Sequence, residues 1–426
     1  MKRISSFLIL VALTVGMLGC GGGPYTLTVT STSGGLVTAP GEGTFTYNAT
    51  TVVNLVAEAE EGYLFDEWTG NVSTIANVTA ATTTITMHGN YTITANFYKP
   101  EIRTWYDLDA IRDNPGGSYL LMNDLNSTIP GYEELASPTA NGGKGWQPIC
   151  GIVSFTGTFD GHGYKIKDLF SNRPDEDGVG LFCSVGESGI VKNISVVNAN
   201  MTGAYYTVVL VGFNYRGTVS NCHSTGTVSG KDIVSGLVGI NAGTVSNSYS
   251  TATVTGSYFV GALVAANGGA ALGVDEGTVT NCYSGGNVSG NECVGGLVGV
   301  SAGPVSNSYS TSSVTGNNFT GGLVGCNNGP VSNSYSTSSV TGDENVGGLV
   351  GINYDTVSNS FWDTETSGQA TSDGGTGKNT TEMHDIDTFS GATWNITTVS
   401  GLGERNSSYI WNIVDSVTYP FLSWEP

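Results

Sequence analysis

Charged side chains are scarce in this sequence, and basic ones are the scarcest. Only 12% of the 426 residues are Asp, Glu, Lys or Arg, and 35 acidic residues outnumber 14 basic ones, which gives a formal net charge of −21. No Lys or Arg occurs between Lys231 and Lys378. Because such a surface repels nucleic acids and anionic lipids, the composition excludes a nucleic-acid-binding protein.

Long apolar runs are missing as well, apart from one at the N-terminus. A basic start precedes an apolar stretch over residues 4–18, which is short for a membrane span and ends in MLGC at Cys20. Residues 1–20 resemble a bacterial lipoprotein signal, although Met17 stands where such signals usually have leucine. The resemblance implies a lipidated Cys20, and an ordinary secretory signal is the alternative. Both predict an exported chain, lipid-anchored at the cell surface or outer envelope or else secreted, with the lipid as its only membrane contact.

Small and β-favouring residues make up much of the remainder. The chain has 63 glycines, is rich in Thr, Ser, Asn and Val, and is 39% hydrophobic. It is too apolar for a disordered chain and carries too little charge for an ordinary globular enzyme. We therefore expect an all-β fold of strands and turns.

Residues 25–99 predict a small β module. YTLTVTS from Tyr25 alternates apolar and polar residues, as does YTITANF at Tyr91–Phe97. These stretches and GYLFDEWTG at Gly62–Gly70 resemble the divergent InlB B-repeat family of bacterial and archaeal surface proteins. The resemblance implies a β-grasp-like fold used as a stalk. We expect Trp68 in the core of this module rather than on a ligand platform.

Residues 101–178 predict the N-terminal cap and first coils of a second domain. Thr104–Asn114 has the pattern of a short helix with a threonine cap, and Leu108 and Ile111 share one face. Such a helix can cover the open edge of a solenoid. The stretch FTGTFDGHGYKIKDL then looks like the first coils of exported right-handed β-helix proteins. Pairing of Cys150 with Cys183 stays open.

Residues 179–362 repeat one sequence with small changes. Aligned on one asparagine, the copies follow at steps of 28, 26, 34, 26, 26 and 26 residues, so the period is 26 with an eight-residue insertion near Ala270–Glu276. A unit this short cannot bury a core alone, so a fixed period of this length predicts stacked coils. The aligned residues are Asn193, Asn221, Asn247, Asn281, Asn307, Asn333 and Asn359.

Three short strands are expected in each unit, from the GGLVG, VSNSYS and SVTG stretches. They predict a right-handed parallel β-helix with three strands in each coil and a rise of ~4.8 Å from coil to coil. The aligned asparagines are expected to form a structural ladder, since amides one coil apart can hydrogen-bond along the stack. The expected interior columns are Leu237, Leu263, Leu297, Leu323 and Leu349, and Val245, Val279, Val305, Val331 and Val357.

An aromatic column follows the asparagines at a fixed distance. The first unit, in which Ile194 and Val196 flank Ser195, favours side chains that point outwards; period-two counting from Val245 places them inside instead. Pointing outwards, the tyrosines would form an exposed binding strip for a glycan or a surface protein. The column is His223, Tyr249, Tyr283, Tyr309, Tyr335 and Phe361.

The cysteine spacing argues against a disulfide framework in the repeats. Cys222 and Cys282 share a register but lie two coils apart, roughly 9–10 Å, which is beyond the reach of a bridge. Cys293 precedes a glycine pair and Cys326 follows one, so they are expected at different positions of the coil. Small interior side chains are the expected role of these four residues.

The motifs SGLVG at Ser235–Gly239 and GGLVG at Gly295, Gly321 and Gly347 resemble the GLUG-motif family. The resemblance implies an exported surface protein, often an adhesin or a cell-wall-associated repeat protein, and no activity by itself. Residues 363–426 form a loop and a tail whose aromatic residues are expected to cover the open edge of the last coil: Trp394, Trp411, Phe421 and Trp424.

No catalytic residue, metal site or cofactor is predicted. The repeats lack the basic residue and paired carboxylates of polysaccharide lyases and hydrolases, and no Ser/His/Asp set or Cys/His metal spacing is present. The sequence therefore predicts a non-catalytic cell-surface protein for adhesion or structural display. A polysaccharide-active β-helix enzyme and a passive spacer are the alternatives.

Overall fold

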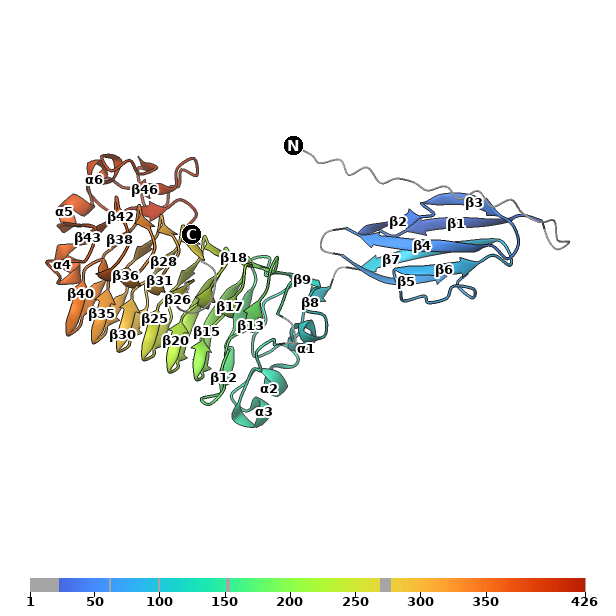
Figure 1. Cartoon of the computed structure of the whole chain (residues 1–426), viewed down its shortest axis with the longest axis horizontal. Coiled ribbons are helices and arrows are strands. Elements are labelled where there is room, and N and C mark those ends of the chain that lie inside the picture. The colour runs from blue at the N-terminus through green and yellow to red at the C-terminus, as the bar shows by residue number, and fades with distance from the viewer. Residues whose placement is uncertain (1–22, 61–62, 99, 151–153, 269–276, 426) are drawn as a thin grey trace. The chain divides into compact units, whose positions relative to one another are not determined.

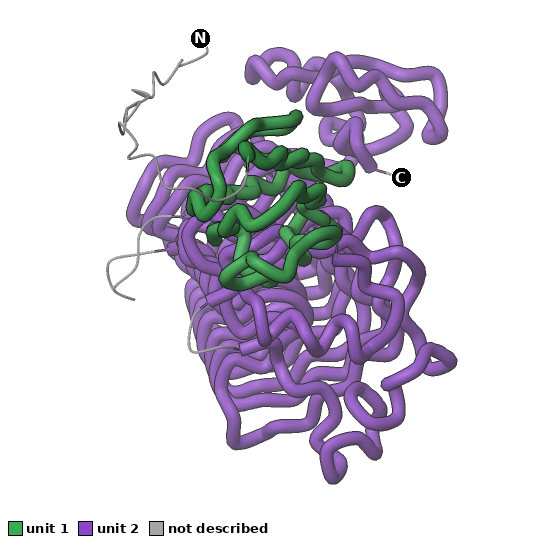
Figure 2. Tube along the Cα trace, turned by 90° about the vertical axis from the view of Figure 1, so that its right-hand side faces the viewer, with its two compact units in different colours: residues 1–98 green, residues 99–426 purple. Residues whose placement is uncertain are grey.

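The computed structural model describes residues 23–60, 63–98, 100–150, 154–268 and 277–425. The chain divides into two compact units, residues 1–98 and 99–426, which have different colours in Figure 2. The expected signal, Cys20 and the expected insertion near Ala270–Glu276 lie outside the described residues. Within the described ranges, no helix is both long and apolar enough to cross a membrane.

The first unit packs two sheets on one core. One sheet contains β1 (Tyr25–Ser31), β3 (Gly43–Tyr47), β5 (Leu64–Gly70) and β7 (Tyr91–Tyr98), and the other contains β2 (Gly35–Ala39), β4 (Val52–Ala59) and β6 (Thr82–Thr86). Trp68 is buried between them and its indole N–H donates to the carbonyl oxygen of Ala80 at 3.1 Å, which confirms the core position. The described part of this unit contains no helix, so its likeness to a β-grasp fold is limited to strands.

The second unit is a parallel β-helix, as predicted (Figure 1). Equivalent residues of successive coils pair in register, for example Val279 with Val305 and Val305 with Val331. One ladder contains β8 (Glu101–Ile102), β9 (Ser118–Leu121), β10 (Thr158–Asp160), β14 (Ile190–Lys192), β18 (Thr218–Ser220), β22 (Thr244–Ser246), β27 (Thr278–Thr280), β32 (Val305–Ser306), β37 (Val331–Ser332) and β42 (Val357–Ser358).

The next ladder along the chain carries the aromatic column and the segment after it. It contains β11 (Lys165–Lys167), β12 (Phe170–Asn172), β15 (Ser195–Thr202), β19 (His223–Ser229), β23 (Tyr249–Ser250), β24 (Thr253–Thr255), β28 (Tyr283–Ser284), β29 (Asn287–Ser289), β33 (Tyr309–Ser310), β34 (Ser313–Thr315), β38 (Tyr335–Ser336), β39 (Ser339–Thr341), β43 (Phe361–Asp363) and β44 (Thr376–Lys378).

Two further ladders meet at the GGLVG motif. The first contains β16 (Tyr205–Thr207), β20 (Asp232–Ser235), β25 (Tyr258–Gly261), β30 (Glu292–Gly295), β35 (Asn318–Gly321) and β40 (Glu344–Gly347). The second contains β13 (Phe182–Val185), β17 (Val211–Asn214), β21 (Val238–Asn241), β26 (Val264–Asn267), β31 (Val298–Ser301), β36 (Val324–Asn327) and β41 (Val350–Asn353).

Each coil is therefore divided more finely than into three strands. The coil from Val305 to Asn327 contains β32, β33, β34, β35 and β36. The predicted VSNSYS strand breaks at Asn307, whose left-handed φ of 48° interrupts the alternation of side chains. GGLVG is a corner rather than a strand, because Gly321 ends β35 and Val324 begins β36.

The glycines of this corner allow two backbones to touch. A Cβ atom at Gly321 would lie 1.9 Å from the carbonyl oxygen of Val324, and one at Gly325 would lie 2.6 Å from the backbone of Cys293. No side chain fits between the two ladders at these positions. Glycine recurs at these positions because β36 lies too close to β35 and to β30 for a side chain to fit.

The interior of the coils contains the predicted apolar columns. All five leucines of the leucine column are fully buried, as are the valines of the valine column from Val245 to Val331 within 1% of exposure. Val357, in the last coil, is partly buried against the same core. These columns confirm the register assigned from the 26-residue period.

A short helix follows β8 near the start of the second unit. It consists of α1 (Trp105–Asp109) and the 3-10 turn η1 (Ala110–Asp113). The hydroxyl of Thr104 accepts from the N–H of Asp107 at 3.2 Å, and the Asp107 carboxylate accepts from the N–H of Thr104 at 2.8 Å. Leu108 and Ile111 are fully buried, so the predicted cap and apolar face are confirmed.

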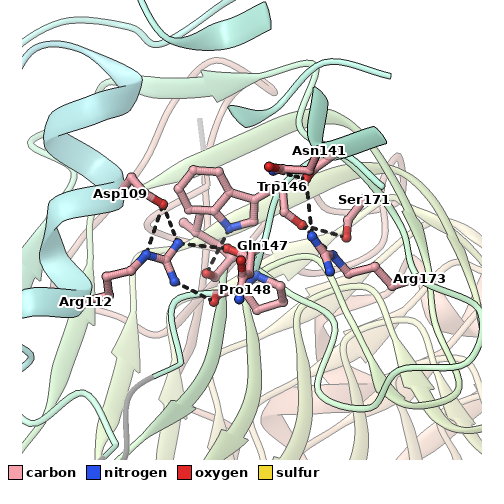
Figure 3. A network of polar contacts seen from close by, with 10 residues as sticks. Asp109, Arg112, Asn141, Trp146, Gln147, Pro148, Ser171 and Arg173 are labelled. Atoms are coloured by element: carbon pink, nitrogen blue, oxygen red, sulfur yellow. Dashed lines mark hydrogen bonds and ion pairs between the residues drawn. The ribbon is translucent and has the colours of Figure 1, made fainter. Parts of the chain in front are cut away.

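Two arginines hold the cap against the first coils (Figure 3). Arg112 donates to the carbonyl oxygens of Gln147 and Pro148, each at 3.1 Å. Arg173 is buried and donates to the carbonyl oxygen of Trp146 at 3.0 Å. Through these charge-assisted bonds Arg112 joins η1, and Arg173 joins the end of β12, to the loop that follows α2 (Tyr132–Leu135) and α3 (Ala140–Gly143).

The C-terminal segment leaves the last coil and turns back beside the stack (Figure 1). The loop after α4 (Thr364–Ser367) covers the edge of the last coil, where Ser372 accepts from the N–H groups of Leu349 and Val350 at 3.2 and 2.8 Å. The chain then forms α5 (Thr380–Met383), α6 (Ile386–Ser390), β45 (Ile396–Thr398), β46 (Trp411–Ile413) and β47 (Phe421–Leu422). The prediction that the tail aromatics cover the end of the stack is wrong, because they pack on its flank.

Candidate functional site

The aromatic column is a continuous stack of rings. The centroids of His223, Tyr249, Tyr283, Tyr309 and Tyr335 follow one another at 4.6, 4.5, 5.1 and 4.9 Å, with ring planes within 9° of parallel. The pairing of β23, β28, β33 and β38 in register sets this spacing. Because each of five successive coils contributes one ring, the column extends over the length of five coils.

The column faces away from the interior of the coils. Val305 lies in the interior core, whereas Tyr309 and Tyr335 belong to a separate cluster with residues of the C-terminal segment. Period-two counting fails here because the left-handed φ at Asn307 lies between Val305 and Tyr309 and reverses the alternation. The outward direction favoured by the first unit is the one that the structure shows.

The C-terminal segment nevertheless covers much of the column. Tyr309 and Tyr335 are 7% and 1% exposed, beneath Trp394 and Trp411. The predicted exposed strip of four tyrosines is therefore wrong for these two. Tyr249 and Tyr283 remain half-buried, with the ring of Trp424 at 6.5 and 5.8 Å.

Burial shifts the pKa values of ionisable groups where the C-terminal segment meets the column. The Tyr309 hydroxyl donates to Oε1 of Glu425 at 3.0 Å. Burial raises the pKa of Glu425, opposed by bonds from the Leu422 N–H and the Tyr309 hydroxyl. Burial likewise holds the pKa of Tyr335 well above its usual range, and its hydroxyl donates to the carbonyl oxygen of Pro420. The covered part of the column is thus a packed interface in which ionisation is disfavoured.

The aligned asparagines form the corner before the aromatic column. All seven have left-handed φ values, between 46° and 55°. At the start of the column, Nδ2 of Asn221 donates to Oδ1 of Asn193 at 3.1 Å, and Nδ2 of Asn193 donates to Asp160 at 3.0 Å. The backbone explains why asparagine recurs here, since it tolerates this conformation better than other side chains.

A second amide ladder, which the sequence reasoning missed, lies inside the β-helix at the ends of β17, β21 and β26. Nδ2 of Asn214 donates to Asn241 at 2.8 Å, Asn241 to Asn267 at 2.9 Å, and Asn267 to the hydroxyl of Ser301 at 3.1 Å. All four are fully buried. The 26-residue step from Asn241 to Asn267 was the signal that could have found this ladder.

Replacing Asn241 with alanine is expected to lower the free energy of unfolding by about 3 kcal/mol, because Asn214 and Asn267 each lose a buried partner. Chemical unfolding measures the change. The matched control is Asn317→Ala, which removes an exposed amide pair with Asn291 and should change stability by less than ~0.5 kcal/mol. Equal losses in the two variants would contradict a structural role for the interior ladder.

The cysteines are paired more extensively than expected. Cys150 and Cys183 form a disulfide with a Cα–Cα distance of 5.4 Å, which answers the open question. Cys293 and Cys326 are also bonded, with a Cα–Cα distance of 5.2 Å, so the expectation of two interior thiols is wrong. They do occupy different strands, β30 and β36, but the glycine corner brings these strands together, and the φ of 51° at Cys293 turns its side chain out of the alternation.

Cys222 and Cys282 are buried and unbonded, as expected of interior side chains. Burial raises the pKa of each thiol to about 12, so both are inert as nucleophiles.

A serine and a histidine that the sequence reasoning did not connect lie on adjacent coils. Oγ of Ser195 is 3.0 Å from Nδ1 of His223. Burial, and secondarily Lys165, lowers the pKa of His223 to about 4. No carboxylate bonds to this ring in the described part of the chain, and the low pKa makes His223 a weak base. The pair lacks the orienting acid of a hydrolase triad. In the same described ranges, no three His, Cys, Asp or Glu residues gather as a metal site would require.

Two hollows lie along the corner formed by the asparagines. The first, of about 430 Å³, is lined by Asp160, Asn193, Ser195 and Asn221. The second, of about 420 Å³, is lined on one side by Asn247 and Asn281 and on the other by residues of the C-terminal segment: Asn395, Tyr409, Ile410 and Trp424. Both open beside the uncovered part of the aromatic column.

Parts of the chain are similar in sequence to known proteins. Residues 25–101 match the family model of the divergent InlB B-repeat domain. The chain is 37% identical over 140 residues to halomucin of Haloquadratum walsbyi, and 35% identical over 131 residues to a protein of Evansella cellulosilytica described as a candidate Gly-rich membrane protein. These stretches cover 31% and 28% of this chain but only 1% and 14% of the relatives.

One solved structure is similar in architecture. It is described as a candidate immunoglobulin A1 protease of Bacteroides ovatus, is 19% identical, and has a TM-score of 0.47 over 77% of this chain and 93% of its own. A likeness of this degree says nothing about activity.

Proposed function

We propose that this chain is a non-catalytic cell-surface protein that displays its β-helix for adhesion, with the divergent InlB B-repeat domain as a stalk. The main support for the proposal is that the same chain contains this domain and a β-helix with few charged residues. No cationic side chain occurs from Asp232 to Gly377, so this part of the β-helix offers no electrostatic site for nucleic acid or anionic lipid. The relative described as a membrane protein supports an exported location. We include the assignment of the repeats as GLUG motifs in this proposal.

The anchor in this proposal is a lipid on Cys20. Replacing Cys20 with alanine should abolish a diacylglycerol-sized mass increment and release the protein from the cell envelope, since the thiol is the acceptor. Intact mass and fractionation of cells measure both effects. The conservative control is Cys222→Ser, which replaces a buried thiol. This variant should keep the lipid increment and the location of the wild type. A wild-type chain without the lipid increment would instead indicate an ordinary secretory signal.

Adhesion itself is tested by binding of the purified chain to cells and to immobilised glycans. Silence in both assays would leave only a spacer role. Incubation with a panel of polyuronates, followed by measurement of unsaturated products and reducing ends, tests the enzymatic alternative. The low pKa of His223, and the fact that no carboxylate in the described ranges bonds to its ring, support the expectation that no products form.

A further inference from the structure

We propose that the uncovered part of the asparagine corner is an extended binding groove for a neutral oligosaccharide, which lies along the axis of the β-helix and ends against Trp424. The inference deepens the proposed adhesive function and rests on it. It replaces the four-tyrosine strip with a different set of side chains, because the C-terminal segment buries Tyr309 and Tyr335.

The asparagines of the corner that line the two hollows belong to four successive coils. Ser220 pairs with Ser246, and Ser246 with Thr280, so Asn221, Asn247 and Asn281 follow one another in register. The two hollows are lined by consecutive members of this column. The groove therefore presents one amide for each coil, at the ~4.8 Å spacing of neighbouring strands. This repeat is close to the advance of an extended pyranose chain, so successive sugars can meet equivalent groups.

The chemistry of the second hollow suits a sugar. An amide both donates and accepts, as a vicinal pair of sugar hydroxyls requires. Oδ1 of Asn281 and the indole N–H of Trp424 are buried at this hollow and make no hydrogen bond in the structure. Oδ1 of Asn395 already accepts from the N–H of Ile410 at 2.6 Å, which orients its Nδ2 group as a donor. These groups supply hydrogen-bonding capacity that the protein itself does not use.

Aromatic rings supply the second element of sugar recognition. Tyr409 is 39% exposed, and the half-buried ring of Trp424 lies against Tyr249 and Tyr283. The apolar faces of pyranose rings pack on such side chains. Among the described residues, no Asp, Glu, Lys or Arg lines this hollow, and the charged residue of the first hollow is Asp160, whose carboxylate is paired with Lys192 at 3.5 Å. The net charge of −21 repels anionic chains. The ligand is for these reasons a neutral glycan rather than a uronate or a sulfated one.

The test is calorimetric titration of the purified full-length chain with cello-, chito- and manno-hexaose, with hexagalacturonate as the charged comparator. At least one neutral hexaose should bind, and hexagalacturonate should bind at least tenfold more weakly. Asn247→Gly and Tyr409→Ala should each weaken the neutral ligand at least tenfold. Glycine keeps the left-handed backbone of Asn247, and Tyr409 lies at the surface, so both variants should fold.

The matched control is Asn333→Gly, which makes the same change two coils beyond the groove. It should leave affinity within twofold of the wild type. The proposal is overturned if no neutral hexaose binds, if hexagalacturonate binds as tightly, or if Asn333→Gly weakens binding as much as Asn247→Gly. A chain that still adheres to cells under any of these outcomes keeps its surface role and loses only the groove.

Discussion

Replacing Trp411 with alanine should lower the free energy of unfolding of the C-terminal segment by about 3–5 kcal/mol. The side chain is fully buried, and its ring lies 4.8 Å from that of Trp394, 5.8 Å from Tyr335 and 6.0 Å from Tyr309. Removing it leaves a cavity between β46 and the aromatic column. Because the coils have their own interior core, the segment should detach while the β-helix stays folded.

Limited proteolysis and near-ultraviolet circular dichroism separate these two events. In the variant, protease should first cleave the segment C-terminal to Thr380. The rings of Tyr309 and Tyr335 should then become accessible to solvent. Leu402→Ala is the control, since Leu402 belongs to the same segment but is 65% exposed and should change stability by less than ~0.5 kcal/mol. A Trp411→Ala chain as resistant to protease as the control would show that the segment is held by other contacts.

Replacing Gly321 with valine should lower the free energy of unfolding by about 3 kcal/mol or more, at the upper end of what overpacking costs. A Cβ atom there would lie 1.9 Å from the carbonyl oxygen of Val324 and 2.7 Å from the N–H nitrogen of Gly351. Both neighbours are backbone, so neither can rotate away. The ladders that contain β35 and β36 would have to separate over several coils.

Thermal unfolding of Gly285→Val, which changes a glycine in the preceding coil, provides the comparison. A Cβ atom at Gly285 would meet only two side-chain ends, the hydroxyl of Thr311 at 3.1 Å and the methyl group of Thr251 at 3.7 Å, and the position is exposed. This variant should lie within ~0.5 kcal/mol of the wild type, since Gly285 is exposed between β28 and β29 and no backbone atom lies close to the added side chain. Similar losses for Gly285→Val and Gly321→Val would show that the close contact between ladders is not what selects glycine.

How far the sequence anticipates the structure depends on the distance that a contact spans. The step of 26 residues was enough to place Val305 above Val279 and below Val331, because parallel strands one coil apart repeat the same register. The cap at Thr104 is a contact over three residues, and it too was predictable. Both depend on neighbours that recur at a fixed interval along the chain.

The aromatic column shows where such counting stops. Its direction depended on one backbone angle at Asn307, which the period of the sequence does not encode. The bond between Cys293 and Cys326 depended on how closely two ladders approach, and that is set by the space beside Gly325. The interior ladder through Asn241 and Asn267 repeats at the 26-residue step, but the step alone does not indicate that these amides are buried and bonded to each other.

The sequence by itself determined the all-β class, the 26-residue coil, the apolar columns and the helical cap. Each follows from local pattern and in-register stacking, in which every residue meets its own equivalent. Only the tertiary structure decided that the C-terminal segment folds back over Tyr309 and Tyr335 and leaves a hollow at Asn247 and Asn281. Those contacts join segments about 85 to 116 residues apart, without any period, so they depend on shape and burial rather than on repetition.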